Sequence, residues 1–312
     1  MNDMKDMKEQ KEQNFVSVVA YVHDDEAAIP AFAAMALRVL SAHFLHYELI
    51  FVDDASRDGS VDAIRAAARG ADGTVQIVRM SYPQGLELSM EAGDALAIGD
   101  YVYEFDTIAI DYADELVTEL YEAALAGHDI VTAAPAGRRP LSSRLFYRLY
   151  NASARTAHPL QTETFRLLSR RALNRIRTMS RTIPYRKAVY ANCGLAQAAI
   201  TYEPQGTARR REAEGRLRQA VDALVLFTDL GYRAAFALTA VLLAFALVIG
   251  LYALYMFASQ QAITGWTSLM LVIAFIAAGL SGLGAILAKY LDLLLGHVFR
   301  RQTYIVEGIE KL

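Results

Sequence analysis

The feature that most constrains this 312-residue chain is an unbroken run without a charged side chain, from Ala234 to Ala288. A bilayer core is crossed by about 20 apolar residues in a helix, so the run is long enough for two spans. We place the spans near 235–256 and 266–287, with polar residues at 259–261 as the turn. A buried hairpin in a soluble protein would need a very large surrounding core, so two transmembrane helices are the favoured interpretation.

Basic residues flank this run on both sides and are absent from its turn. Arg233 and five arginines between positions 209 and 218 precede the run, and Lys289, Arg300 and Arg301 follow it. The positive-inside rule then predicts a multi-pass protein of the cell (inner) membrane with both termini in the cytoplasm. The net charge of −3 gives no electrostatic reason to expect a nucleic-acid partner.

The region before the apolar run alternates between two hydrophobic periods. The first 14 residues are charged, which excludes a secretory signal peptide and predicts a disordered tail. Short runs rich in β-branched residues then predict strands at 15–20, 47–52, 75–80 and 101–105, and helical spacing predicts helices at 27–44, 61–69 and 86–97. Strands that alternate with helices indicate an α/β fold with a mainly parallel sheet.

Acidic residues follow three of the predicted strands. Asp24 comes just after the first strand, Asp53 and Asp54 end the second, and Asp106 ends the fourth. Ligands of such sheets bind outside the carboxyl ends of the strands. A single Asp there is usually a helix cap. Acids at three strand ends favour a ligand site in which Asp53 and Asp54 accept hydrogen bonds from a base or ribose.

The nine residues from Val52, VDDASRDGS, together with the later strand that ends in Asp106, resemble family 2 glycosyltransferases of the GT-A fold. SSRLFYRLYN at 142–151, FRLLSRR at 165–171 and the two terminal spans make the chain similar to the polyprenyl-phosphate glycosyltransferases, the group of dolichyl-phosphate-mannose synthase. This resemblance implies transfer of a sugar from a nucleotide-sugar donor to a membrane polyprenyl phosphate at the cytoplasmic face. It also implies a divalent metal, Mg²⁺ or Mn²⁺, and a homo-oligomer, often a tetramer.

The resemblance and the apolar run together divide the chain into five parts. These are a tail at 1–14, a GT-A domain at 15–205, a juxtamembrane amphipathic segment at 206–233, two transmembrane helices at 234–288, and a cytoplasmic C-terminal helix and strand at 289–312.

The resemblance further implies roles for individual residues. Asp106 takes the first position of the family's Asp-x-Asp metal motif, and Glu163 lies one position from the family's candidate catalytic base. Arg138 and Arg210 stand where the family contacts donor phosphates. Alternatives stay open: a surface or helix-capping role for Glu163, a solvated loop for Arg138 and lipid anchoring for Arg210. The donor side would comprise Ala20, Val22, Asp24, Phe51, Asp53, Asp54, Asp106, Arg138 and Arg210.

The metal motif is incomplete, because Asp106 is followed by Thr107 and Ile108. A hard divalent cation needs oxygen ligands, which isoleucine lacks; Asp111 and Asp114 are the nearest alternative carboxylates. Two interpretations follow: arginines carry more of the diphosphate charge at an altered metal site, or the protein no longer catalyses efficiently. The competing hypotheses are a glycosyltransferase with a different donor and a catalytically inactive, glycosyltransferase-like membrane protein with a binding or regulatory role.

Overall fold

The structure is a computed structural model that describes residues 11–136, 162–179, 186–205 and 304–312, with scattered positions between 237 and 294. The chain divides into two compact units. One is an α/β domain that includes the C-terminal residues 302–312, and the other comprises residues 149–155 and 215–301.

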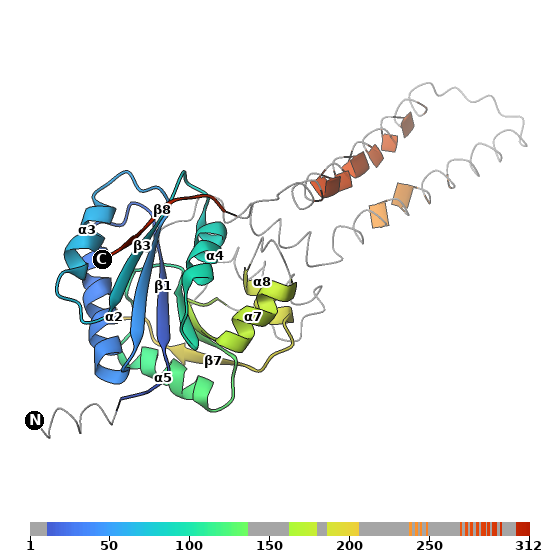
Figure 1. The fold of residues 1–312 in the computed structure, drawn as a ribbon. Coiled ribbons are helices and arrows are strands. Elements are labelled where there is room, and N and C mark those ends of the chain that lie inside the picture. The colour runs from blue at the N-terminus through green and yellow to red at the C-terminus, as the bar shows by residue number, and fades with distance from the viewer. Residues whose placement is uncertain are drawn as a thin grey trace, which may run out of the picture. The chain divides into compact units, whose positions relative to one another are not determined.

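The α/β domain is built on an eight-stranded sheet in the order β7-β5-β6-β4-β1-β2-β3-β8 (Figure 1). The strands β1 to β4 run parallel to one another, whereas β6 and β8 pair antiparallel with their neighbours. The prediction of an α/β fold with a mainly parallel sheet is therefore confirmed. The strands are β1 (Val16–Val22), β2 (Tyr47–Asp53), β3 (Thr74–Met80), β4 (Tyr101–Phe105), β5 (Ile130–Pro135), β6 (Phe165–Ser169), β7 (Gln197–Tyr202) and β8 (Val306–Lys311).

Helices cover both faces of this sheet. The helices α2 (Ile29–His43), α3 (Ser60–Ala68) and α5 (Glu115–Leu125) contribute to one hydrophobic cluster with the strands. On the opposite face α4 (Leu86–Leu96) packs so closely that a Cβ on Gly93 would lie 2.4 Å from Val19 Cγ1. The helices α7 (Arg170–Met179) and α8 (Arg186–Asn192) contact α4 through side chains, so they belong to that second layer.

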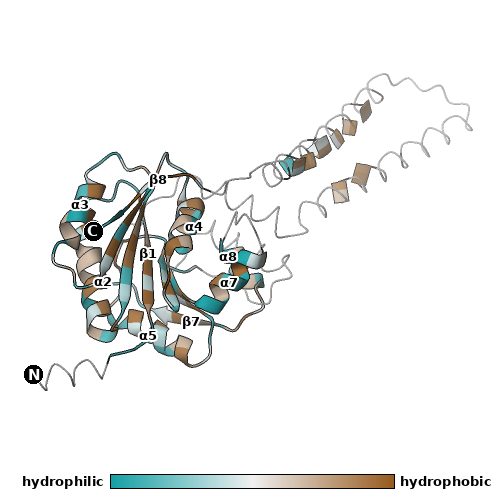
Figure 2. Cartoon of the chain, in the orientation of Figure 1, coloured by the Kyte–Doolittle hydropathy of each residue, from teal (hydrophilic) through white to brown (hydrophobic). Residues whose placement is uncertain are grey.

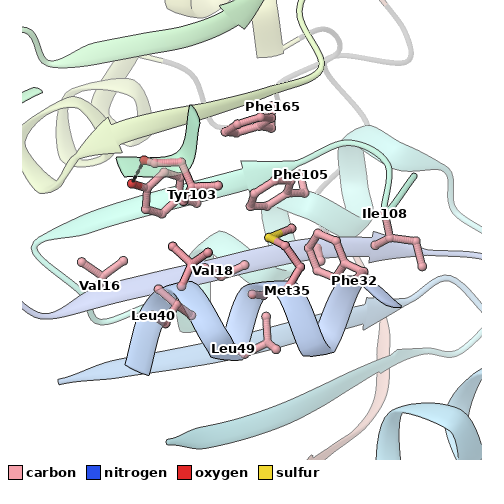
Figure 3. Close-up of a cluster of buried hydrophobic side chains, with 14 of the residues drawn as sticks. Val16, Val18, Phe32, Met35, Leu40, Leu49, Tyr103, Phe105, Ile108 and Phe165 are labelled. Atoms are coloured by element: carbon pink, nitrogen blue, oxygen red, sulfur yellow. Dashed lines mark hydrogen bonds between the residues drawn. The ribbon is translucent and has the colours of Figure 1, made fainter. Parts of the chain in front are cut away.

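Side-chain alternation along the strands explains these two layers. In β1, Val18 and Ala20 belong to the cluster on the α2 side, whereas Val19 between them packs against α4. Phe32 of α2 lies edge-on to Phe105 at 5.1 Å between ring centroids, in the centre of this cluster (Figure 3). Figure 2 shows the hydrophobic residues along the central strands. Each fully buried aromatic or aliphatic side chain of this kind stabilises the fold by roughly 1.5–3 kcal/mol.

Residues 11–14, which we expected in the disordered tail, are instead held against the domain. The Glu12 N–H donates to the carbonyl of His43 at 2.9 Å, and the Leu45 N–H donates to the carbonyl of Glu12 at 3.0 Å. The Asn14 side-chain amide donates to the Tyr121 hydroxyl at 2.7 Å. These hydrogen bonds compensate the conformational entropy lost when residues 11–14 become ordered. Such contacts cannot be inferred from the charged composition of the segment.

The end of the chain returns to the α/β domain as an edge strand. The strand β8 pairs antiparallel with β3, with Ile309 opposite Val78. Arg65 binds both carboxylate oxygens of Glu310, at 3.0 and 2.7 Å. The chain thus leaves this domain after β7 and re-enters it beside β3.

The described positions of the C-terminal unit are helical. A Cβ on Gly279 would lie 2.5 Å from Leu242 Cδ1, so two helical segments approach closely at this glycine. Over the described part of the chain, no helix combines the length and the apolar character needed to cross a bilayer. Large apolar side chains at nine described positions are 43–61% exposed, namely Val241, Val248, Leu269, Ile273, Phe275, Leu280, Leu287, Leu291 and Leu294.

Candidate functional site

The sheet register brings three of the predicted acidic positions to one edge. Asp53 ends β2 opposite Val22 of β1. On the other side of β1, Ala20 pairs with Phe105, and Asp106 follows Phe105 directly. Because β6 runs antiparallel to β4, the residues before Phe165, including Glu163, enter the sheet at this same edge.

The loop after β1 and the loop after β2 are hydrogen-bonded to each other. The Asp24 carboxylate accepts the Arg57 N–H at 2.6 Å, and the Asp24 N–H donates to the Ser56 hydroxyl at 2.9 Å. Asp24 has a φ of 49°, in the left-handed region that Asp tolerates better than most residues. The Glu26 carboxylate accepts the Gly59 N–H at 3.0 Å. Asp24 therefore shapes the rim of the strand edge through main-chain contacts.

Asp53 and Asp54, predicted to act together, have different surroundings. The Asp54 carboxylate accepts the N–H groups of Gln84 and Gly85, at 2.6 and 2.8 Å, and the Tyr21 hydroxyl at 2.9 Å. It therefore fixes the loop that leads into α4. Asp53 accepts a longer bond from the Ser56 N–H at 3.3 Å. Burial raises the pKa of the Asp53 carboxyl, with the hydrogen bonds from Ser56 acting in the opposite direction.

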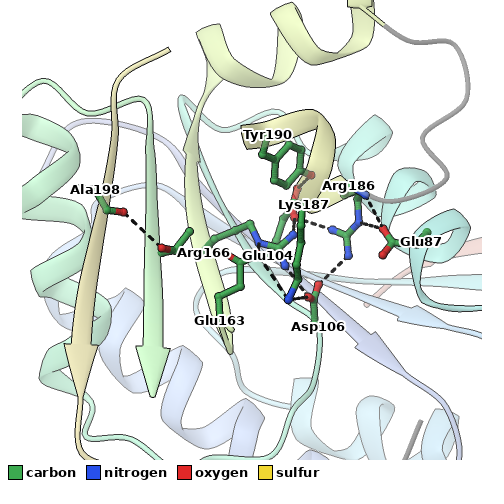
Figure 4. Close-up of polar contacts among 10 residues, drawn as sticks. Glu87, Glu104, Asp106, Glu163, Arg166, Arg186, Lys187, Tyr190 and Ala198 are labelled. Carbon is green, nitrogen blue, oxygen red and sulfur yellow. Dashed lines mark hydrogen bonds and ion pairs between the residues drawn. The ribbon is translucent and has the colours of Figure 1, made fainter. Parts of the chain in front are cut away.

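Asp106 is held by two guanidinium groups (Figure 4). Arg166 Nη2 lies 2.5 Å from Oδ2 and Arg186 Nη2 lies 2.7 Å from Oδ1, so both carboxylate oxygens are engaged. Burial acts to raise the pKa of Asp106, but the charges of Arg166, Arg186 and Lys187 outweigh it and hold this pKa well below its usual range. Asp106 is therefore a permanent carboxylate near neutral pH.

Glu104, two residues earlier on β4, completes this buried cluster. Its carboxylate binds Arg166 Nη1 at 2.7 Å, Arg186 Nη1 at 2.5 Å and the Tyr190 hydroxyl at 2.7 Å. The Arg186 Nε donates to Glu87 of α4 at 2.8 Å. Fully buried charges persist only when paired in this way, and the guanidinium fork is suited to bridging two carboxylates.

Glu163 and Lys187 lie at the outer side of the cluster. Lys187 Nζ is 3.7 Å from Asp106 Oδ2 and 3.6 Å from Glu163 Oε1. Glu163 also lies 3.0 Å from Arg166 Nε and is 10% exposed. The structure thus places Glu163 close to Asp106, as the partner of two cations.

The metal motif does not have the surroundings that a divalent cation needs. Ile108 is 2% exposed and belongs to the hydrophobic core (Figure 3). Asp111 accepts the Tyr202 hydroxyl at 2.6 Å, and Asp114 pairs with Arg38. Within the described ranges, no group of three His, Cys, Asp or Glu residues has metal-site geometry. Because guanidinium groups occupy both oxygens of Asp106, these residues do not fit a cation bound there.

The remaining predicted residues fall into two groups. Ala20, Val22 and Phe51 are completely buried, with their side chains in the hydrophobic core, so contacts with a donor would have to come from the backbone. Arg138 and Arg210 lie outside the described residues.

Comparison with known proteins adds sequence relationships. Residues 17–180 match the family described as glycosyl transferase family 2. An uncharacterized glycosyltransferase of Bacillus subtilis is 24% identical over 94% of both chains. A prophage bactoprenol glucosyl transferase homolog of Escherichia coli is 24% identical over 95% of this chain and 99% of its own. An undecaprenyl-phosphate 4-deoxy-4-formamido-L-arabinose transferase of Aeromonas hydrophila is 34% identical over 116 residues, which are 37% of this chain and 35% of its own.

A solved structure shares the fold. A mannosyltransferase from Pyrobaculum calidifontis, in complex with GDP-Man and Mn²⁺, superposes with a TM-score of 0.52 at 15% sequence identity. The match covers 86% of this chain and 87% of the mannosyltransferase.

Proposed function

This chain belongs to glycosyl transferase family 2, and we propose that it transfers a sugar from a nucleotide-sugar donor to a polyprenyl phosphate in the membrane. The observation that carries the proposal is the end-to-end similarity to the bactoprenol glucosyl transferase homolog, which includes the C-terminal unit as well as the α/β domain. Because the similarity extends through the C-terminal unit, we infer that this chain uses the same kind of acceptor, a polyprenyl phosphate.

The donor would bind at the carboxyl ends of β1, β2 and β4. Asp53 is suited to the base or ribose, because hydrogen bonds from ligand groups would compensate the burial of its carboxylate. The loops that Asp24 and Asp54 hold in place would form the walls of this site. Such preorganised loops reduce the entropy lost when the donor binds.

The path of the chain supports the membrane half of the proposal. Because β8 lies in the same sheet as β7, the intervening segment must begin and end on the same side of any bilayer, which requires an even number of crossings. The exposed apolar side chains of the C-terminal unit would be costly in water and favourable in lipid. We therefore infer two spans in the cell membrane with both termini in the cytoplasm.

The reaction is a displacement at the anomeric carbon of the sugar. The bond from this carbon to the donor phosphate breaks, and a new bond forms to a phosphate oxygen of the lipid. That oxygen is already anionic near neutral pH, so a strong general base is not required. This agrees with Glu163 being paired to cations. The main demand is stabilising the negative charge on the departing nucleoside diphosphate.

One observation favours the second candidate, a nucleotide-binding protein without activity. Asp106 is bound by two arginines, and the second acidic position of the Asp-x-Asp motif is occupied by the buried Ile108. The residues that bind the metal in the family are therefore not all present. Such a protein would keep the donor site and lose transfer.

The test is a transfer assay on membranes that contain the full chain, with a panel of radiolabelled nucleotide sugars and extraction of the lipid fraction. We expect label in the lipid with at least one donor. Asp53→Asn should reduce this label strongly, whereas the matched control Asp62→Asn, 83% exposed on α3, should not. Nucleotide binding without transfer would establish the inactive alternative, and neither binding nor transfer would overturn both.

A further inference from the structure

Lys187 occupies a distinctive place in the charged cluster. It lies at the second position of α8, and its ammonium group lies within 4.0 Å of both Asp106 and Glu163. Arg166 and Arg186 are 0% and 1% exposed at their side chains, whereas Lys187 retains 15%. Lys187 thus points its positive charge toward Asp106 at the end of β4 (Figure 4), and it is the most exposed of the three cations.

The carboxylates of this cluster already have cationic side chains as partners, without a metal. The cations Arg166, Arg186 and Lys187 are each paired with carboxylates, namely Glu87, Glu104, Asp106 and Glu163. A divalent cation approaching Asp106 would have to displace guanidinium groups from both carboxylate oxygens. An anionic ligand would meet Lys187 first, because it is the most exposed of the three cations.

We propose that the Lys187 ammonium stands in place of the divalent cation and binds the donor diphosphate directly, so that the protein uses its donor without a metal. This inference rests on the proposed function. In a metal-dependent site the cation bridges carboxylates and diphosphate. Lys187 makes the carboxylate half of that bridge, and its flexible four-carbon stem allows it to reach a phosphate oxygen.

The chemistry follows from the charge that develops during transfer. As the bond between the anomeric carbon and the donor phosphate breaks, its electron pair moves to the phosphate oxygen. An ammonium group has three N–H donors, so Lys187 can donate to that oxygen while it stays paired with Asp106 and Glu163, without transferring a proton. Asp106 and Glu163 act as positioning residues, because they hold Lys187 at the strand edge.

The test measures binding of UDP and GDP to the purified full chain by titration calorimetry, in EDTA and in Mn²⁺, alongside the lipid-transfer assay. Wild type should bind one of these nucleotides and transfer sugar in EDTA, with little gain from Mn²⁺. Lys187→Met, which keeps the aliphatic stem, should weaken binding by about 10- to 100-fold, as expected for a lost hydrogen bond to a charged group. Lys187→Arg should restore most of the affinity. Arg38→Ala, which removes a surface cation paired with Asp114, should leave binding unchanged.

The outcomes separate this inference from the proposed function. Transfer by wild type only in Mn²⁺, or unchanged nucleotide affinity in Lys187→Met, would overturn the role of Lys187 and leave the glycosyltransferase intact. Absence of transfer under every condition would instead overturn the proposed function. A purely structural Lys187 would lower the melting temperature of Lys187→Met without creating the difference between the Met and Arg variants.

Discussion

Replacing Arg166 by Met tests whether the buried charged cluster holds the domain together. The Arg166 side chain is completely buried and contacts Glu104, Asp106 and Glu163 at 2.7, 2.5 and 3.0 Å. Methionine fills a similar volume but removes the charge. Each of the three carboxylates then loses one of its cationic partners.

The expected cost follows from what each carboxylate keeps. Removing one partner of a buried ion pair costs about 3–5 kcal/mol when the other is left uncompensated. After Arg166→Met, Glu104 keeps Arg186 and Tyr190, and Asp106 keeps Arg186. The cost therefore falls at the lower end, about 3 kcal/mol. For a domain of this size, that lowers the melting temperature by roughly 6–12 °C.

The assay is thermal unfolding of the full chain in detergent, followed by circular dichroism. The matched control is Arg171→Met, because Arg171 also pairs with an acid, Asp129, but is 71% exposed and should change nothing measurable. In a Glu104→Gln background the cost of Arg166→Met should shrink, since the shared charge is gone. Equal melting temperatures for Arg166→Met and Arg171→Met would show that the buried cluster does not stabilise the domain in this way.

Two further predictions concern α4. Gly93→Ala would place a Cβ 2.4 Å from Val19 and 2.6 Å from Val52, and we expect a loss of about 1–3 kcal/mol by denaturant unfolding; unchanged stability would contradict this packing. Burial raises the pKa of Glu91 from 4.5 to about 7, so the folded state binds this proton more tightly and wild type loses stability as pH rises through this window. Glu91→Gln should therefore gain stability relative to wild type between these pH values, by at most about 3 kcal/mol and by less because the side chain is partly exposed. A difference in unfolding free energy between wild type and Glu91→Gln that does not change with pH would contradict a raised pKa of Glu91.

The individual strands and helices could be predicted from the sequence, because each has its own hydrophobic periodicity. The strand expected at 47–52 is found at Tyr47–Asp53, and the helix expected at 86–97 is found at Leu86–Leu96. Hydrophobic periodicity reports which face of an element is buried, and that is a local property. The antiparallel insertion of β6 beside β4 and the return of β8 to β3 depend on pairings between distant segments, which periodicity does not encode.

The same limit applies to the candidate site: residues at strand ends could be found from the sequence, whereas residues brought there by distant segments could not. The strand-end positions of Asp53 and Asp106 followed from the alternation of elements, and the register confirms that they flank β1. Asp54 looked equivalent to Asp53, but it holds main-chain groups about thirty residues away. Arg186 and Lys187 belong to a helix of seven residues without a motif, so only the structure brings them to Asp106. Arg166 could have been suspected, because a charged residue inside an apolar strand needs a partner.

The donor site and its lack of a metal are tested most directly by a crystal structure of the full chain with a bound nucleoside diphosphate, grown in Mn²⁺ and measured at the manganese absorption edge. We expect the base or ribose against Asp53, the diphosphate within about 3 Å of Lys187 Nζ, and no manganese signal at Asp106. A nucleotide bound away from the ends of β1, β2 and β4, or a manganese ion coordinated by Asp106, would contradict this expectation.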